Sequence, residues 1–146
     1  MPGRPATFLA SMFVVAGALT SVGLVPITAA TAGAEPIASP PFVDHAQWSH
    51  WGDLSSLRVY PTPSGRVAAR ELNNAVQGDE AWTEVLALSP DADLPGMREQ
   101  FMCHWSFAEI VEPGKTSWNL EPWRPVVDDE TMVDARCNPG GTEEPF

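Results

Sequence analysis

Residues 97–108 read MREQFMCHWSFA, and this stretch decides the fold. Its large apolar side chains recur at spacings of four, four and three residues, at Met97, Phe101, Trp105 and Ala108. Such spacings put the four side chains on one face of an α-helix, which predicts a helix with its apolar stripe against a core. The same helix carries Cys103 on a neighbouring face.

Two further helices are predicted upstream of this stretch. One spans residues 67–77, where the apolar residues follow helical spacing, and it ends at Gly78. The other spans residues 80–88 and stops near Ser89-Pro90; its core-facing residues are Trp82, Val85 and Leu86. Trp82 and Trp105 both lie on helical stripes and are therefore expected in the core.

Short strands complete the expected fold. Residues 57–60 and 118–121 alternate apolar and polar side chains and each run stops at a proline, which favours strands, the second of them at a sheet edge. Residues 61–65 predict a turn, residues 128–130 predict a solvated turn or a helix start, and residues 45–51 are too short to assign. The expectation is a small α+β single domain with two or three helices, a few short strands and one disulfide.

Composition excludes several classes of function. The chain has 146 residues with 8 Lys+Arg against 19 Asp+Glu, a formal charge of −11. This balance disfavours nucleic acid and anionic membrane surfaces as partners, because both require a basic face. Two cysteines are too few for a thiolate zinc site. An apolar fraction of 44% is too high for simple disorder.

Residues 1–34 have the pattern of a secretory signal peptide. Arg4 is the only charge before Glu35, an apolar run follows to about Val25, and the small residues 32–34 form a cleavage site after Ala34, with residues 30–32 as an alternative. An uncleaved membrane anchor is the other reading of this run. No second apolar span follows, so the mature protein is expected not to span a membrane and to be secreted or associated with the cell envelope.

Cleavage near Ala34 leaves 112 residues with seven basic and 19 acidic side chains, a charge of −12. Residues 35–44 are rich in proline and predict a mobile leader. Residues 45–141 form the expected globular domain, and residues 142–146 form a tail.

Cys103 and Cys137 are the only cysteines, and an oxidising compartment favours their pairing. The bridge closes a loop of about 33 residues, worth roughly 3–4 kcal/mol on the chain-entropy model. The alternative is a reactive Cys103 paired with His104. Neighbouring residues on a helix point about 100° apart, which disfavours that pair.

Residues 118–125, WNLEPWRP, supply the candidate ligand site. Exposed tryptophan beside polar groups stacks on sugars or on proline-rich peptides, and arginine binds carboxylates. The candidates are Trp118, Asn119, Glu121, Trp123 and Arg124. The alternative is that Trp118 and Trp123 fill the core, since six tryptophans are a large share of a small interior.

Catalytic and metal signals are weak. His104 is the candidate base, and helix spacing pairs Glu80 with Glu84 and Glu109 with Glu112. His45 and His50 with nearby acids do not form a metal-binding spacing, and residues 128–134 lack the EF-hand pattern. No metal and no cofactor is expected.

The C-terminal half resembles a known family. Residues 100–104 (QFMCH), Lys115, residues 118–125 and residues 137–139 (CNP) are similar to small exported bacterial proteins, mainly actinobacterial, grouped as DUF2599, a domain of unknown function. The resemblance covers roughly residues 51–141. It implies export and pairing of the two cysteines, and it implies no activity.

These features together favour a non-enzymatic exported protein that binds a glycan or a protein in the envelope or outside it. A small cell-wall hydrolase that uses His104 or a glutamate is the first alternative. An inhibitor that presents residues 59–65 as a stiff loop to an extracellular enzyme is the second.

Overall fold

The computed structural model describes Gly3 and residues 38–141. The expected signal peptide, apart from Gly3, its cleavage site, residues 35–37 of the leader and the tail at 142–146 lie outside the described residues. In the described part of the chain, no helix has both the length and the apolar character needed to cross a membrane.

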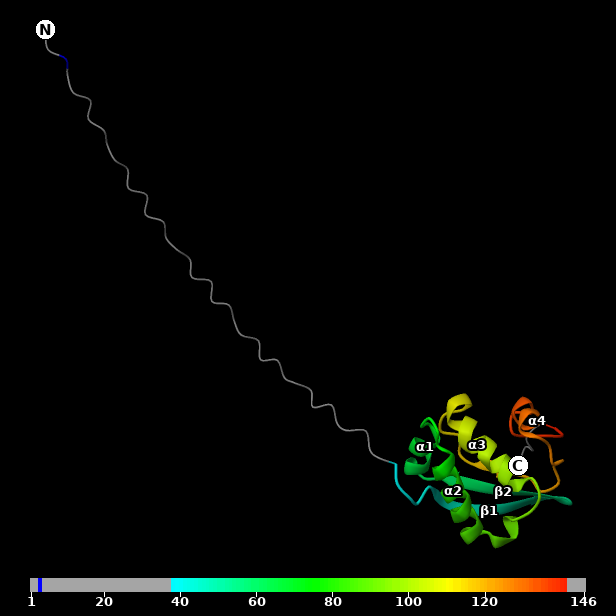
Figure 1. Cartoon of the computed structure of the whole chain (residues 1–146). Helices are drawn as coiled ribbons and strands as arrows, with labels where there is room; N and C mark the ends of the chain where they lie inside the picture. Colours follow the sequence, from blue (N-terminus) through cyan, green and yellow to red (C-terminus); the bar gives the residue numbers. More distant parts are fainter. Residues whose placement is uncertain (1–2, 4–37, 142–146) are drawn as a thin grey trace. The chain divides into compact units, whose positions relative to one another are not determined.

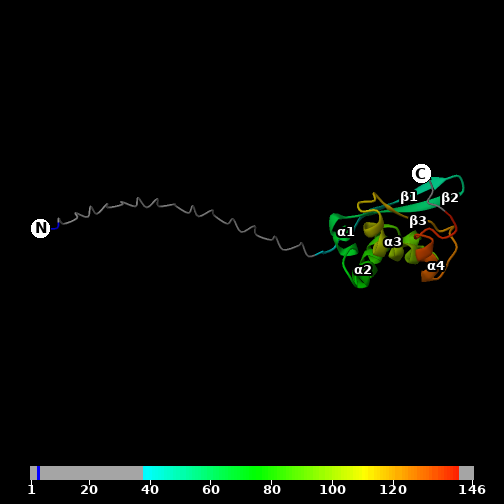
Figure 2. The ribbon, with the colours of Figure 1, turned by 90° about the horizontal axis from the view of Figure 1, so that it is seen from above.

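The described domain has two layers, a sheet and a set of helices on one of its faces (Figures 1 and 2). The sheet is antiparallel in the order β1-β2-β3, and its strands are β1 (Val43–Trp51), β2 (Leu54–Pro61) and β3 (Trp118–Leu120). The helices are α1 (Pro63–Ala69), α2 (Ala75–Leu88), the 3-10 turn η1 (Pro90–Ala92), α3 (Met97–Val111) and α4 (Asp129–Asp134). The α+β prediction is confirmed, with four α-helices in place of two or three.

The helix predicted from residues 97–108 is confirmed as α3, which packs beneath the sheet. Its Phe101 and Trp105 are fully buried and meet Leu57 and Val59 of β2 in one core. Trp82 of α2 joins them, with ring centroids 5.5 Å from Phe101. The expected core positions of Trp82 and Trp105 are therefore confirmed.

Residues 45–51, which could not be assigned from their pattern, belong to β1. A two-residue turn connects Trp51 with Leu54, and its Gly52 has a φ of +58°, which a glycine adopts without strain. The hairpin pairs Trp48 with Leu57 and Ala46 with Val59, so β1 takes its register from the buried face of β2.

The predicted boundary between the first two helices is wrong. Helix α1 ends at Ala69, Asn73 has a φ of +61°, and the Asn74 side chain donates a hydrogen bond to the Ala69 carbonyl at 2.9 Å. Helix α2 then runs through Gly78 instead of stopping there. Gly78 serves close packing, because a Cβ at this position would lie 2.8 Å from Met102 Cε.

The predicted turn at residues 61–65 is wrong as well, because α1 begins at Pro63. Thr62 caps the helix by accepting a hydrogen bond from the Gly65 N–H at 2.9 Å, and proline is favoured at the first helical position. Residues 59–65, expected as a stiff inhibitory loop, are thus the end of β2 and the start of α1.

The end of the expected leader contributes to the fold. Phe42 is 1% exposed and packs edge-on against Trp105 with ring centroids 5.7 Å apart. Glu84 of α2 accepts hydrogen bonds from the backbone N–H groups of Phe42 and Val43, both at 2.7 Å. This carboxylate, one of the candidate acids, ties the start of β1 to α2.

Gly65→Ala is expected to lower the free energy of unfolding by about 2–3 kcal/mol, because overpacking against rigid atoms is costly. A Cβ on Gly65 would lie 2.2 Å from the Phe42 carbonyl oxygen, which belongs to the backbone. Gly78→Ala is the milder comparison, since its Cβ would lie 2.8 Å from the flexible end of Met102 and 3.0 Å from the Trp105 ring, and it would meet no backbone atom that close. Both changes gain about 1 kcal/mol of helix propensity. Urea unfolding should show the larger loss for Gly65→Ala, and an equal or smaller loss would contradict this packing.

Candidate functional site

Residues 118–121 lie at the β3 edge of the sheet, and all four are buried in the interior of the domain. In β3, Trp118 pairs with Val59 and Leu120 pairs with Leu57. Trp118 is fully buried, and its ring centroid lies 5.9 Å from that of Phe101 and 6.0 Å from that of Trp105. Of the two readings of Trp118, core or ligand surface, the structure has the core.

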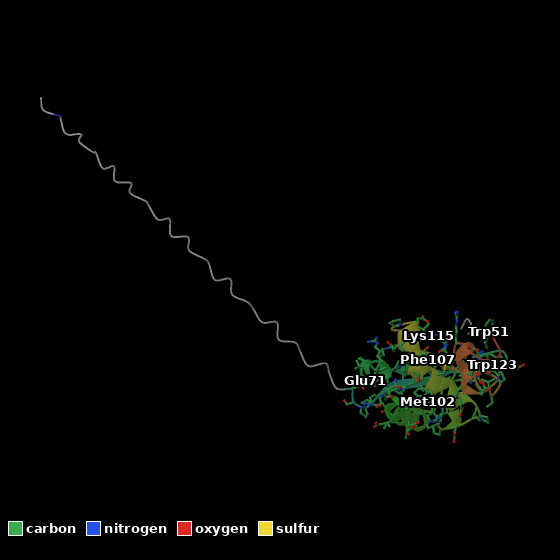
Figure 3. The ribbon with its side chains drawn as sticks, turned by 45° about the horizontal axis from the view of Figure 1, so that its top comes forward. Trp51, Glu71, Met102, Phe107, Lys115 and Trp123 are labelled. Carbon is green, nitrogen blue, oxygen red and sulfur yellow. A yellow bond between two sulfur atoms is a disulfide. The ribbon has the colours of Figure 1, made fainter. Side chains whose placement is uncertain are left out.

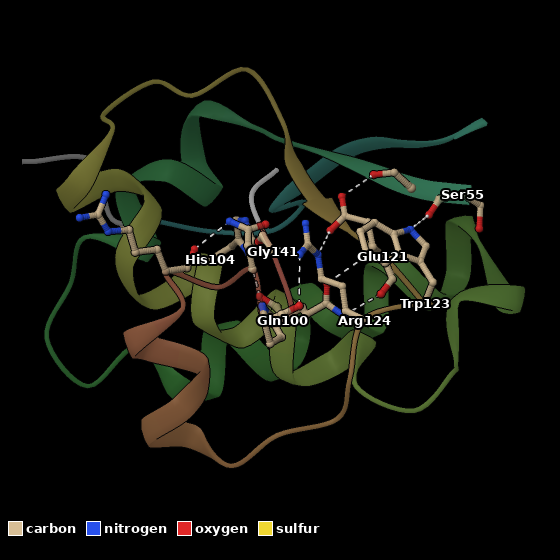
Figure 4. Close-up of polar contacts among 11 residues, drawn as sticks. Ser55, Gln100, His104, Glu121, Trp123, Arg124 and Gly141 are labelled. Atoms are coloured by element: carbon tan, nitrogen blue, oxygen red, sulfur yellow. Dashed lines mark hydrogen bonds and ion pairs between the residues drawn. The ribbon is translucent and has the colours of Figure 1, made fainter. Parts of the chain in front are cut away.

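Glu121 is the centre of a buried polar network (Figure 4). Its carboxylate accepts hydrogen bonds from Arg124 Nε at 2.6 Å and from the Ser56 hydroxyl at 2.9 Å. Its backbone N–H donates to Gln100 Oε1 at 2.9 Å, and its carbonyl accepts from Gln100 Nε2 at 3.0 Å. One residue therefore connects β2, α3 and the segment that follows β3.

Arg124 extends this network to the end of the described chain. It is 3% exposed, and its Nη1 donates hydrogen bonds to the carbonyls of Pro139 at 3.2 Å and Gly141 at 3.0 Å. Its guanidinium also lies over the ring of Trp123, 4.7 Å from the centroid, a cation–π contact. The arginine thus holds the segment after α4 against β3.

Four of the five candidate ligand residues are buried. Besides Trp118, Glu121 and Arg124, Asn119 is 8% exposed and its Oδ1 accepts a hydrogen bond from Ser117. Trp123 is half-buried, and its indole N–H donates to the Ser55 carbonyl at 3.0 Å. A ligand-contact role for these five residues stays a prediction, and the structure gives each of them a bond or ring contact inside the fold.

The candidate base His104 is buried in α3. Its Nδ1–H donates to the Gln100 carbonyl at 2.9 Å, one turn earlier in the same helix (Figure 4). His45 lies apart from it on β1, where it binds the Asp44 carboxylate at 2.6 Å and stacks on Tyr60. Among the described residues, no group of three or more histidine, cysteine or acidic side chains is placed to hold a metal ion.

The paired carboxylates that helix spacing suggested have separate structural partners. Glu109 of α3 is buried and accepts hydrogen bonds from both Arg66 and Arg70, so it clamps α1 onto α3. Glu112, one turn later, is exposed and lies 3.7 Å from Lys115 Nζ. The structure uses Glu109 as an anchor rather than leaving it in a cleft.

An open groove of about 620 Å³ lies between α3 and α4. The predicted disulfide is present, with Cys103 and Cys137 joined at 2.04 Å, and both cysteines line the groove with His104 at its buried base. The cross-link therefore anchors the C-terminal side of the groove to α3. On the chain-entropy model it contributes roughly 3–4 kcal/mol to stability.

The groove has exposed apolar walls. Phe107 and Val111 of α3 are 39% and 76% exposed, and Val133 of α4 is 46% exposed. Figure 3 shows Phe107 on α3 between Met102 and Lys115. A second hollow of about 380 Å³ shares Phe107 and Val133 with the first. These two side chains thus form a ridge between two hollows.

Helix α4 is short and depends on its attachments. Asp128 caps it by accepting a hydrogen bond from the Thr131 N–H at 2.8 Å. The Thr131 side chain and backbone N–H together hold the pKa of Asp128 below its ordinary value of 3.8. The Asp128 carboxylate is therefore ionised, and its helix-capping hydrogen bond intact, at all pH values above this lowered pKa. Met132 packs against the disulfide in a small cluster separate from the main core.

The exposed apolar walls of the groove were not selected from the sequence, although Cys103, His104 and Cys137, which line the same groove, were. Phe107 and Val111 are apolar residues that fall outside the stripe of Met97, Phe101, Trp105 and Ala108. Apolar side chains beside a complete core stripe are the one sequence signal that points to this surface. Val133 carries no such signal, because contacts distant in the sequence, among them the disulfide, bring it next to α3.

Arg124→Met is expected to lower the free energy of unfolding by about 3–5 kcal/mol, because it leaves the Glu121 carboxylate buried without its partner. Chemical denaturation of the oxidised protein measures this loss. The double variant Glu121→Leu/Arg124→Met removes both charges and should recover part of it. If the single variant is as stable as the wild type, the pair does not hold the fold.

The family match covers nearly the same residues as the described domain. The model of the family described as "Protein of unknown function (DUF2599)" matches residues 43–140. An uncharacterized protein of Mycobacterium tuberculosis is 62% identical over 111 residues, which are 76% of this chain and 74% of that protein. An uncharacterized protein of Mycobacterium leprae is 54% identical over 103 residues, which are 70% of this chain and 83% of that protein. No solved structure matches. The chain belongs to the DUF2599 family.

Proposed function

We propose that this protein is exported and acts outside the cytoplasm as a non-enzymatic binding protein, with the groove between α3 and α4 as its binding surface. The observation that carries the proposal is the exposed apolar wall of that groove. Phe107 and Val111 lie on α3, Val133 lies on α4, and the disulfide ties the turn after α4 to α3, so these side chains present a fixed surface. Clustered exposed apolar side chains in a concave site are typical of binding surfaces.

Export is supported by two features. Residues 1–34 combine a basic start, an apolar run and small residues at a cleavage site. The domain has one disulfide and, among the described residues, no free cysteine, and such bridges persist in oxidising compartments. A stable cross-link next to the proposed surface suits a protein that works outside the cytoplasm.

A binding role is favoured over catalysis because the strongest catalytic candidates have structural partners. His104 donates to its own helix, Glu109 is bound by two arginines, and Glu84 holds the start of β1. The groove offers apolar surface with charged groups at its rim. Such a surface provides affinity through burial, and the rim charges provide orientation.

Export is tested by expressing the full chain in a mycobacterial host and fractionating the culture. The expected result is a chain that begins at Glu35 in the envelope or medium, with its cysteines oxidised, as intact mass spectrometry reports. Replacing the small residues of the cleavage site, Ala32→Arg with Ala34→Arg, is expected to leave the precursor uncut. Full-length protein with free thiols in the cytosol would refute export.

Binding is tested by sedimenting the exported protein with isolated envelope and assaying the supernatant for free protein, sugars and peptides. Val111→Ser is expected to reduce retention several-fold. Val76→Ser is the matched control, because Val76 lies on α2 outside both hollows and is equally exposed, at 76%. Equal loss in both variants would argue against the groove. Release of sugars or peptides would instead favour the hydrolase.

A further inference from the structure

The groove has a cationic group at its rim that no carboxylate of residues 38–141 pairs with. Arg136 lines the groove and is exposed, and it directly precedes Cys137 of the disulfide. Its φ is +53° and that of Cys137 is +64°, a conformation that costs free energy in residues other than glycine. The cross-linked turn therefore holds the backbone of Arg136 in one place beside the apolar walls.

Most of the other basic side chains in residues 38–141 are engaged by carboxylates of the domain. Five of them pair with a carboxylate of the chain: Arg66 and Arg70 with Glu109, Arg98 with Asp79, Lys115 with Glu112, and Arg124 with Glu121. Within residues 38–141, Arg136 forms no such pair. In a chain with 19 acidic and 8 basic residues, an arginine without an internal carboxylate partner stands out.

Taken with the proposed binding function, on which this inference rests, the geometry points to the chemistry of the partner. We infer that the groove binds an acidic peptide segment of a partner protein, with an apolar side chain against Phe107 and Val111 and a neighbouring carboxylate on Arg136. An arginine guanidinium binds a carboxylate through two parallel hydrogen bonds, which fixes orientation as well as affinity. Lys115 and Glu112 also line the groove, but they form an ion pair with each other at 3.7 Å, so Arg136 carries the net positive charge of the rim.

A peptide fits this surface better than an acyl chain does. The groove is partly open to solvent, so part of the surface of any occupant stays in water. An acyl chain would then leave part of its apolar surface in water and lose much of the free energy gained by burial. A peptide backbone, in contrast, can form its hydrogen bonds with that water. The ridge of Phe107 and Val133 divides two hollows, which suits two successive side chains of one segment.

The first test selects ligands from a phage-displayed library of random dodecapeptides, with the oxidised, exported protein immobilised. We expect enriched peptides to carry Asp or Glu next to a large apolar residue. Enrichment without an acidic bias, or no enrichment at all, would overturn the inference. Sodium palmitate is added as a competitor. If micromolar palmitate displaces the bound phage peptides from the protein, the groove is assigned to a lipid instead.

The second test measures one enriched peptide, labelled with fluorescein, by anisotropy. Arg136→Gln is expected to weaken binding about tenfold or more, and changing the peptide's carboxylate to its amide should do the same. The two changes together should cost no more than either alone, because they remove one interaction. If Arg136→Gln lowers the melting temperature, the amide peptide on the wild-type protein still tests the contact.

The inference and the proposed function fail in different ways. Peptides that lose affinity with Val111→Ser but are indifferent to Arg136→Gln would keep the groove as a binding surface and remove its preference for acidic partners. Peptides that are indifferent to both changes bind elsewhere and would overturn the inference. Arg136→Lys separates charge from geometry, since it keeps the charge and loses the two-pronged contact, and it should recover only part of the affinity.

Discussion

The rest of the structure depends on the buried ion pair and hydrogen bonds of the Glu121 carboxylate. It is fully buried, and burying a charge is costly unless hydrogen bonds and an opposite charge offset the lost hydration. Arg124 supplies the charge and Ser56 supplies a further hydrogen bond. Gln100 of α3 holds the backbone of the same residue from both sides. The helix that dominates the core and the edge strand of the sheet therefore meet at one residue.

The position of the groove follows from this junction. Arg124 holds the carbonyls of Pro139 and Gly141, and the disulfide holds Cys137 to α3 two residues earlier. Helix α4 has only six residues and packs in a small cluster of its own, so propensity alone would not keep it in place. The buried ion pair and the disulfide thus hold α4 in place as one wall of the groove. Neither of them alone would form that wall.

The sequence predicts this structure best where one periodic pattern covers a whole element. The apolar stripe of α3, the strand at Trp118 and the cysteine pair were all predicted, because each depends on local spacing or on simple chemistry. The helix boundary predicted at Gly78 is wrong, because a glycine inside a helix resembles a terminator until its packing partner Met102 is known. The tryptophans and charged residues of the segment 118–125 suggested a ligand surface, but Glu121 and Arg124, three residues apart, pair with each other in the interior. The pairing is local in sequence, whereas the burial of both side chains is a tertiary property that the sequence pattern does not reveal.

The distribution of charge explains why the groove escapes prediction and why it is the better candidate. A domain rich in carboxylates uses its few arginines as internal anchors, at Glu109 between two helices and at Glu121 beneath the sheet. From the sequence, Arg136 looks like any of these arginines. Only the fold distinguishes it, because the disulfide turn carries it to the rim of an apolar surface, where it pairs with no carboxylate of residues 38–141. Internal anchoring and the proposed recognition thus use the same residue type, and the three-dimensional position of each arginine decides which of the two roles is open to it.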